Sequence, residues 1–260
     1  MAPFYKTAAT LCLVALCGLQ SEAADGTKYK FTPEDVTEEA YLAANLVRNG
    51  NLPVHISEVS KDDTLVTSLK QNVEAKEAST DGTCETLIEG DIKEGFHHIF
   101  EYEVETKAAH DYRQLLQEAL DKGLAVFTDK IYPKDEQAWE KIWEKKDGAN
   151  LAYLLGSNST TIGCVIGNCT EVPSDVDELS DQPETKKQKA VLFCLLSPAT
   201  ASNAAPFTEE YFKGLIERTT LLKDMTKDDL KPSVGNGTAE AAVPTILIAG
   251  LVAMLTAVSA

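Results

Sequence analysis

The histidines and acidic pairs are where catalytic or metal chemistry would first be sought in this sequence. A hydrolase triad needs a nucleophile beside a positioned histidine, and no recognisable motif contains any of the four histidines: His55, His97, His98 and His110. His97 and His98 are adjacent in a predicted strand, so their side chains point to opposite faces and do not chelate one metal together. Glu101 and Glu103 share a face, but in so acidic a chain such pairs are typical of a solvated surface. Because a phosphate loop and a dinucleotide fingerprint are also absent from the sequence, we expect no enzyme activity, no cofactor and no metal.

The cysteines offer a second kind of chemistry. Cys12 and Cys17 lie in an N-terminal segment that we expect to be removed, which leaves an even number in a secreted chain: Cys84, Cys164, Cys169 and Cys194. Two disulfides are therefore predicted. Cys164 and Cys169 lie in one extended run with diverging side chains, so each is expected to have a distant partner. Of the three pairings that four cysteines allow, the spacing favours Cys84 with Cys164 and Cys169 with Cys194. A zinc site is the alternative, but no CxxC pair or nearby histidine supports it.

The N-terminal end of the sequence has the pattern of a cleaved signal peptide, which we place at residues 1–23. A basic Lys6 precedes an apolar run from Ala8 to Leu19, and small residues follow at Ser21 and Ala23. The run is too short to span a bilayer. A buried N-terminal helix is the alternative interpretation.

The C-terminal end indicates a lipid anchor. Residues 241–260 are uncharged and lack a basic stop-transfer flank, and the small residues Gly235, Asn236 and Gly237 are candidate attachment sites. This pattern is typical of a GPI signal, with a tail-type transmembrane helix as the alternative. We therefore expect a GPI-anchored protein on the outer leaflet of the plasma membrane, with an ectodomain at 24–224, a polar stalk with the attachment region at 225–237 and a removed tail at 238–260.

The mature chain is predicted to be strongly acidic. The whole sequence has 24 Lys and Arg and 41 Asp and Glu. Lys6, Glu22 and Glu240 leave with the two end segments, so 23 basic and 39 acidic residues remain and the net charge is −16. Such a surface repels nucleic acids and sulfated glycans, which excludes nucleic acid as a partner and favours neutral or basic proteins.

Two kinds of surface feature follow from the sequence. An acidic stretch over 174–184 is expected to be an exposed loop that contacts a partner or antibodies, with a solvated spacer as the alternative; its candidate contact residues are Asp175, Asp177, Glu178 and Asp181. Sequons for N-glycosylation occur at Asn158, Asn168 and Asn236.

The element that organises the chain is a predicted hairpin over residues 149–169. Leu151, Tyr153 and Leu155 alternate along its first strand, and β-branched residues are frequent after the turn. Trp139 and Trp143 lie at helical spacing and are interpreted as core. The remaining patterns predict helices over 32–49, 60–80, 111–122, 134–146 and from Thr208, and strands over 84–88, 96–104 and 190–197, with an exposed loop over 170–189. Mixed helices and strands indicate an α+β fold, a central antiparallel sheet covered by helices on both faces.

Part of this pattern resembles the CAP superfamily. The resemblance lies in Ile162-Gly163-Cys164 with Cys169 following, in the strand Val191 to Pro198 with Cys194, and in the run Tyr41 to Pro53. With a signal peptide and a GPI-type tail, the whole chain is more closely similar to the SAG surface antigens of Eimeria-type coccidian parasites.

This resemblance implies a CAP-like three-layer α-β-α sandwich and a role in host-cell attachment and invasion, with a host cell-surface protein and antibodies as partners. It also implies the same two disulfide pairs. The histidines and glutamates of the CAP cavity have no counterparts here, since Asn150 or Leu151 stands at the first of these positions. A CAP-like protein that binds a sterol or fatty acid is the competing hypothesis, and a continuous apolar cavity would favour it.

Overall fold

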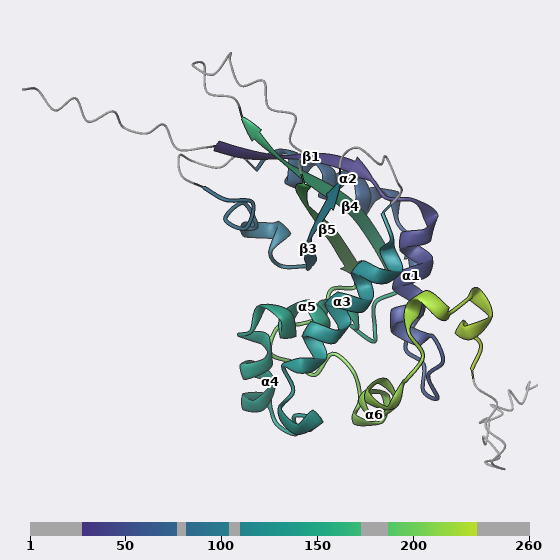
Figure 1. Cartoon of the computed structure of the whole chain (residues 1–260). Coiled ribbons are helices and arrows are strands. Elements are labelled where there is room, and N and C mark those ends of the chain that lie inside the picture. The colour runs from purple at the N-terminus through teal and green to yellow at the C-terminus, as the bar shows by residue number, and fades with distance from the viewer. Residues whose placement is uncertain (1–27, 77–81, 104–109, 173–186, 233–260) are drawn as a thin grey trace, which may run out of the picture.

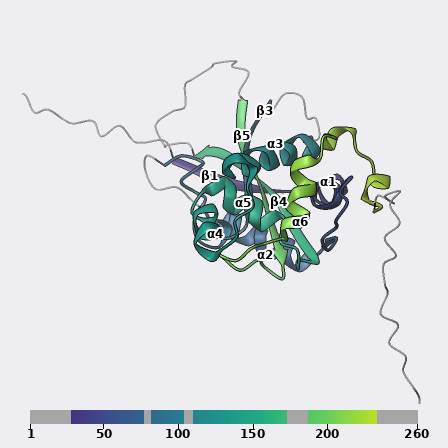
Figure 2. The ribbon, with the colours of Figure 1, turned by 90° about the horizontal axis from the view of Figure 1, so that it is seen from below.

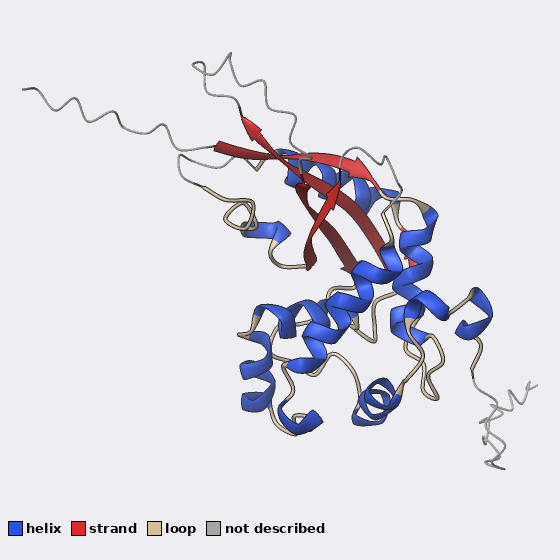
Figure 3. Cartoon of the chain, viewed as in Figure 1, coloured by secondary structure: helices blue, strands red, loops and turns tan. Residues whose placement is uncertain are grey.

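The computed structural model describes residues 28–76, 82–103, 110–172 and 187–232. Four antiparallel strands form a sheet in the order β1-β4-β5-β3 (Figures 1 and 3): β1 (Lys28–Asp35), β4 (Thr161–Val172), β5 (Lys187–Ser197) and β3 (Phe96–Glu103). A short strand, β2 (Ser60–Lys61), pairs with β4 in parallel. The predicted mixture of helices with an antiparallel sheet and two disulfides is confirmed. None of the helices in the described ranges is long and apolar enough to span a bilayer.

The helices pack on both faces of the sheet. Helix α2 (Asp63–Glu74) lies against β1 and β4 on one face. The other face is covered by α1 (Glu38–Asn49), α3 (Tyr112–Ala125) and α5 (Lys146–Leu154). Farther from the sheet lie α4 (Glu136–Trp143) and α6 (Glu209–Glu217), which the view from below places beside α5 and α1 (Figure 2).

Strand β4 contributes side chains to two separate cores. Ile166 faces the core under α1 and α3, whereas Val165 faces the core under α2, as the period of two in a strand requires. Gly163 allows α2 to lie close to the sheet, because a Cβ at this position would be 2.6 Å from the backbone nitrogen of Val66. The sheet therefore forms the middle of the molecule, with apolar contacts on each side.

The two disulfides do not join the pairs that the spacing favoured. Cys84 is bonded to Cys169 and Cys164 to Cys194, so the predicted pairs Cys84 with Cys164 and Cys169 with Cys194 are wrong. Cys164 and Cys169 are an odd number of residues apart in β4 and therefore face opposite sides of the sheet. Cys164 lies directly opposite Cys194 in the pairing of β4 with β5, with Cα atoms 4.2 Å apart. Cys169 faces the core under α2, where Cys84 is also buried.

Several segments adopt a different secondary structure from the predicted one. Residues 170–172 and 187–189, predicted as loop, extend β4 and β5. Residues 149–155 lie in and just after helix α5, so the hairpin of the sheet is β4–β5 instead. Leu151 and Leu154 are buried at helical spacing, and the same run happens to alternate as a strand would. Residues 32–35, predicted as the start of a helix, form the end of strand β1. Helix α1 begins after them, with Thr37 as its N-cap. Residues 84–88 form turns rather than a strand.

The folded part of the chain extends beyond residue 224, so the predicted start of the stalk at 225 is wrong. Met225 is 1 % exposed, and its carbonyl accepts a hydrogen bond from Arg113 Nη1 at 2.6 Å. A short 3-10 helix, η5 (Lys227–Leu230), follows, and the Asn51 N–H donates to the Asp229 carbonyl at 2.8 Å. The apolar Met225 side chain therefore belongs to the core, and η5 is held against the end of α1.

A buried arginine joins α1 to the segments around α5. Arg48 is fully buried, and its guanidinium donates hydrogen bonds over 2.7–3.2 Å to four backbone carbonyls, those of Ser57, Leu154, Gly156 and Ser159. Burial lowers the pKa of Arg48 to about 10, so the group stays charged at neutral pH. The carbonyls of Leu154 and Gly156 lie at the C-terminal end of α5, where the negative end of the helix dipole favours a cation. The Tyr211 hydroxyl donates to the Arg48 carbonyl at 2.6 Å and ties α6 to the same point.

Candidate functional site

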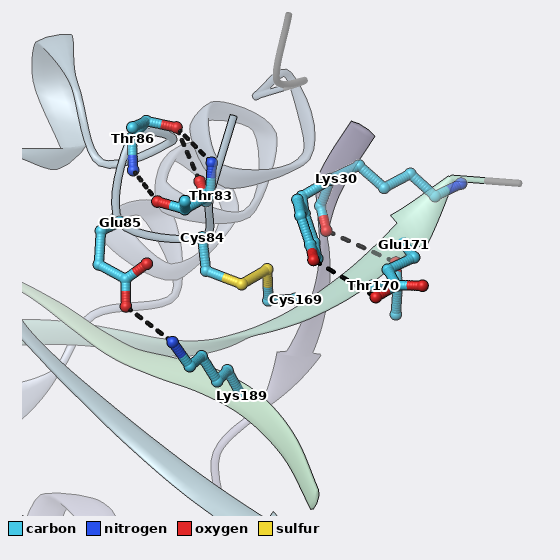
Figure 4. The surroundings of a disulfide bond; sticks show 10 residues. Lys30, Thr83, Cys84, Glu85, Thr86, Cys169, Thr170, Glu171 and Lys189 are labelled. Atoms are coloured by element: carbon cyan, nitrogen blue, oxygen red, sulfur yellow. Dashed lines mark hydrogen bonds and ion pairs between the residues drawn. A yellow bond between two sulfur atoms is a disulfide. The ribbon is translucent and has the colours of Figure 1, made fainter. Parts of the chain in front are cut away.

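A disulfide fixes residues 83–92, which form turns and a short 3-10 helix (Gly90–Ile92), beside the sheet. Figure 4 shows Cys84 of this segment bonded to Cys169 of β4. Thr83 and Thr86 close the turn around Cys84, with the Thr83 N–H donating to Thr86 Oγ1 at 2.9 Å. Lys189 of β5 lies 3.1 Å from the Glu85 carboxylate. A covalent bond and an ion pair both hold this segment, so it has a fixed position beside the cavity described next.

A surface cavity of about 700 Å³ lies between this segment, the start of β3, and helices α4 and α5. Lys93 and His97 line it on one side, and Trp143, Lys146 and Tyr153 line it on the other. The Trp143 and Tyr153 rings meet edge to face, with centroids 5.0 Å apart. Trp143 Nε1 donates to the Ala204 carbonyl at 2.9 Å, which fixes the ring. The prediction that Trp143 is a core residue is confirmed, and the same side chain also forms part of the cavity wall.

The adjacent histidines lie on opposite faces of β3, as the sequence predicted. His97 is 6 % exposed, and its Nδ1 lies 3.2 Å from the Gly95 carbonyl. Because a carbonyl only accepts, Nδ1 carries the proton. Burial lowers the pKa of His97 to about 4, so the ring is neutral. His98 faces α3, with Nε2 3.5 Å from Glu118 Oε2, and burial together with Lys122 lowers the pKa of His98.

The other candidates for chemistry are placed apart from these histidines. His55 Nε2 lies 3.1 Å from the Leu52 carbonyl, and His110 packs against the rings of Phe100 and Tyr102. Glu101 and Glu103 are exposed at the far end of β3. In the described ranges, all four cysteines are in disulfides and no three His, Cys, Asp or Glu side chains are grouped as a metal site would need.

The sequons differ in their surroundings. Asn158 is exposed in the turn between α5 and β4. Asn168 lies within β4, where its Nδ2 donates to Glu34 Oε2 at 2.9 Å and its Oδ1 accepts from the Tyr102 hydroxyl at 2.8 Å. Other predicted site residues lie outside the described residues: Asn236, the attachment candidates Gly235 and Gly237, and the loop residues Asp175, Asp177, Glu178 and Asp181.

We expect Asn158 to carry an N-glycan and Asn168 to carry none. A glycan on Asn168 would be attached at the Nδ2 that donates to Glu34, within a paired strand, whereas the Asn158 side chain is open to solvent. In a secretory host, Asn158→Gln should remove one glycan, seen as a faster gel band that matches enzymatic deglycosylation. Asn168→Gln, the matched control, should not change the band. Loss of a glycan in Asn168→Gln would contradict this expectation.

The cavity and the Arg48 contacts are the features that the sequence did not predict. The residues that line the cavity belong to different elements. The first and last of those named, Lys93 and Tyr153, are 60 residues apart in the sequence (153 minus 93). Periodicity predicts which side chains are buried within one element, but it does not predict which elements meet. The sequence does contain two large aromatic residues, Trp143 and Tyr153, whose rings form one wall of the cavity through an edge-to-face contact.

Comparison with known proteins gives a family match over most of the chain. A family model described as the sporozoite surface antigen (SAG) protein domain matches residues 44–223. Among solved structures, the chain is similar to the Eimeria tenella surface antigen protein SAG19, at 18% sequence identity and a TM-score of 0.45, over 72% of this chain and 97% of that chain. It is also similar to hookworm platelet inhibitor, at 12% identity and a TM-score of 0.39, over 68% of this chain and 79% of that chain. No curated protein matches the chain.

Proposed function

Because the chain belongs to the sporozoite surface antigen (SAG) family of coccidian parasites, we propose that it is a non-enzymatic, GPI-anchored antigen that attaches to a protein on the host cell. The family match over residues 44–223 is the observation that carries this proposal, since a surface antigen is located at the parasite cell surface. The uncharged segment 241–260 and the small residues at 235–237 support the lipid anchor.

The charge of the chain supports attachment through local protein contacts. At a net charge of −16 for the mature chain, long-range attraction to anionic glycans is not available at ordinary salt concentrations. We place the partner and antibody contacts on the acidic loop that contains Asp175, Asp177, Glu178 and Asp181. The strand ends that flank this loop are paired with β1 and β3, and Cys169, near the end of β4, is bonded to Cys84; this supports the proposal by giving the loop a fixed base.

We further propose that the arrangement of helices around the sheet is the CAP-type sandwich. Helix α2 lies on one face of the antiparallel sheet, and α1, α3 and α5 lie on the other. The resemblance places a cavity histidine of that superfamily at Asn150 or Leu151, and Asn150 Oδ1 accepts a hydrogen bond from the His97 backbone N–H at 3.0 Å. In the present chain this position therefore supports the start of β3.

Phosphatidylinositol-specific phospholipase C is expected to release the protein from intact parasites, because it cleaves the lipid from a GPI anchor. The released protein should then bind host cells equally well before and after removal of heparan sulfate. Replacing Asp175, Asp177, Glu178 and Asp181 with Asn or Gln should weaken this binding at least about tenfold. Flow cytometry with labelled protein measures both effects.

The matched control removes four exposed carboxylates elsewhere, in Glu74→Gln, Glu140→Gln, Glu210→Gln and Asp224→Asn. It makes the same change in net charge and should leave binding within about twofold. Equal losses in the two variants would mean that the loop has no special role. Protein that stays on the membrane after phospholipase treatment, with its C-terminal peptide intact in mass spectra, would rule out the anchor.

A further inference from the structure

The cavity beside the start of β3 is lined by two lysines, one on each side, in a chain whose net charge is −17. Lys93 and Lys146 both line it, and neither makes an ion pair or side-chain hydrogen bond with a described residue. Both ammonium groups are close enough to His97 to oppose its protonation. Several exposed lysines of the chain have no ion pair, but these two line the same cavity.

Helix α5 adds to this positive potential. It begins at Lys146, and Lys145 at its N-cap makes no side-chain capping bond. The N-terminal end of a helix presents free N–H groups and the positive end of the helix dipole, which together favour an anion. Lys146 and Ala149, both in the first turn of α5, line the cavity. The helix end and the two lysines therefore favour a negatively charged group at the same place.

Three carboxylates also line the cavity and limit how much negative charge it can hold. Glu85 is neutralised by Lys189 at 3.1 Å, whereas Glu94 and Glu144 are exposed and make no ion pair within the described ranges. Because like charges repel, a ligand with several negative charges would meet these two carboxylates. A ligand with one carboxylate matches this distribution better than a polyphosphate would.

The remaining walls specify the rest of the ligand. Trp143 and Tyr153 offer aromatic surface for a planar apolar body. His97 is more than nine-tenths buried, is neutral, and has Nδ1 engaged with Gly95, so its Nε2 is an acceptor without a partner among the described residues. As an acceptor in the cavity wall, this nitrogen can take a hydrogen bond from a ligand or from water.

We propose that this cavity binds a small aromatic carboxylate that also carries a hydrogen-bond donor. Its carboxylate lies between Lys93, Lys146 and the start of α5, its ring packs on Trp143 and Tyr153, and its donor reaches His97 Nε2. The volume of about 700 Å³ falls within the usual range for small-molecule sites. A sterol, which is neutral and almost entirely apolar, matches these charged walls less well. This proposal does not depend on host attachment or on the lipid anchor.

The probe for this site is 4-hydroxyphenylacetate, which has one carboxylate, one ring and one phenolic donor. Calorimetric titration of the protein, as a secretory host processes it, should show binding below about 1 mM. Two relatives of this probe test the carboxylate and the phenolic donor separately. 4-Hydroxyphenylacetamide lacks the charge and should bind at least about tenfold more weakly, and 4-methoxyphenylacetate lacks the donor and should bind at least about threefold more weakly.

A pair of matched variants locates the site. Lys93→Gln with Lys146→Gln should lower affinity for the carboxylate at least about tenfold, and leave affinity for the amide within about twofold. The control, Lys213→Gln with Lys223→Gln, removes two other exposed lysines and should leave both affinities within about twofold. The lysines in both variants are exposed, so neither variant is expected to unfold the protein.

Three results would overturn the proposal. The first is an absence of measurable heat with 4-hydroxyphenylacetate at about 1 mM. The second is equal affinity for the carboxylate and the amide, which would rule out a role for the two lysines. The third is an equal loss in the two double variants, which would mean that net charge and not this cavity controls binding.

Discussion

Replacing Arg48 with methionine is expected to lower the free energy of unfolding by about 3–5 kcal/mol, a large share of the roughly 5–15 kcal/mol that stabilises a typical domain. Methionine fills much of the same volume but donates no hydrogen bond. Four buried carbonyls would lose their guanidinium donor, those of Ser57, Leu154, Gly156 and Ser159. An acceptor that stays buried without a donor loses solvation as well as the bond. Urea denaturation of the processed protein measures the change.

Two further substitutions test the reason for this loss. Arg113→Met removes a partly exposed guanidinium that bonds the Met225 carbonyl and lies 3.4 Å from Glu39, and it should cost no more than about 1.5 kcal/mol. Arg48→Lys keeps the charge, but a compact ammonium cannot reach four carbonyls in different directions, so its effect should fall between the other two. A loss in Arg48→Met no larger than that in Arg113→Met would contradict the structural role of the buried guanidinium.

The parts of the fold that the sequence predicted are those with an unambiguous local pattern. Thr208 caps α6, and Asp111 precedes α3, because short polar side chains satisfy the free N–H groups of a first turn. Strands β3 and β5 form from the runs that were predicted as strands. Each of these runs is too short for a long helix or is bounded by turn residues. In α5 the pattern was ambiguous, since Leu151, Tyr153 and Leu155 fit both periods, and contacts with α3 and β3 decide for a helix.

The candidate site depends on contacts that local patterns do not contain. Arg48 stands in the last turn of α1, where an arginine is ordinarily exposed, and its burial follows from the return of residues 154–159 to the same place. The side chains of His97 and His98 were predicted to point to opposite faces of their strand, and this is confirmed. What the sequence could not predict is that α5 and the segment around Cys84 would enclose a cavity next to His97.

Removal of the bond between Cys84 and Cys169 is expected to destabilise the protein more than removal of the bond between Cys164 and Cys194. The two bonds close loops of 85 and 30 residues. In the chain-entropy relation these loops correspond to about 4.6 and about 3.7 kcal/mol. Each bond is removed by two Cys→Ala substitutions at buried positions, so the two variants are matched in the side-chain volume that they lose. Urea denaturation compares their free energies of unfolding.

The two variants should also differ in which residues become more mobile, and this difference tests the pairing itself. Residues 83–92 have only turns and one short 3-10 helix, so without the bond to Cys169 their amide hydrogens should exchange faster. Cys164 and Cys194 lie on adjacent strands that backbone hydrogen bonds already join, so their removal should change exchange in β4 and β5 much less. Peptide mapping without reduction should recover Cys84 linked to Cys169. Recovery of Cys84 linked to Cys164 would contradict the register of β4, because Cys164 would then have to leave the core that it shares with Cys194 and face α2.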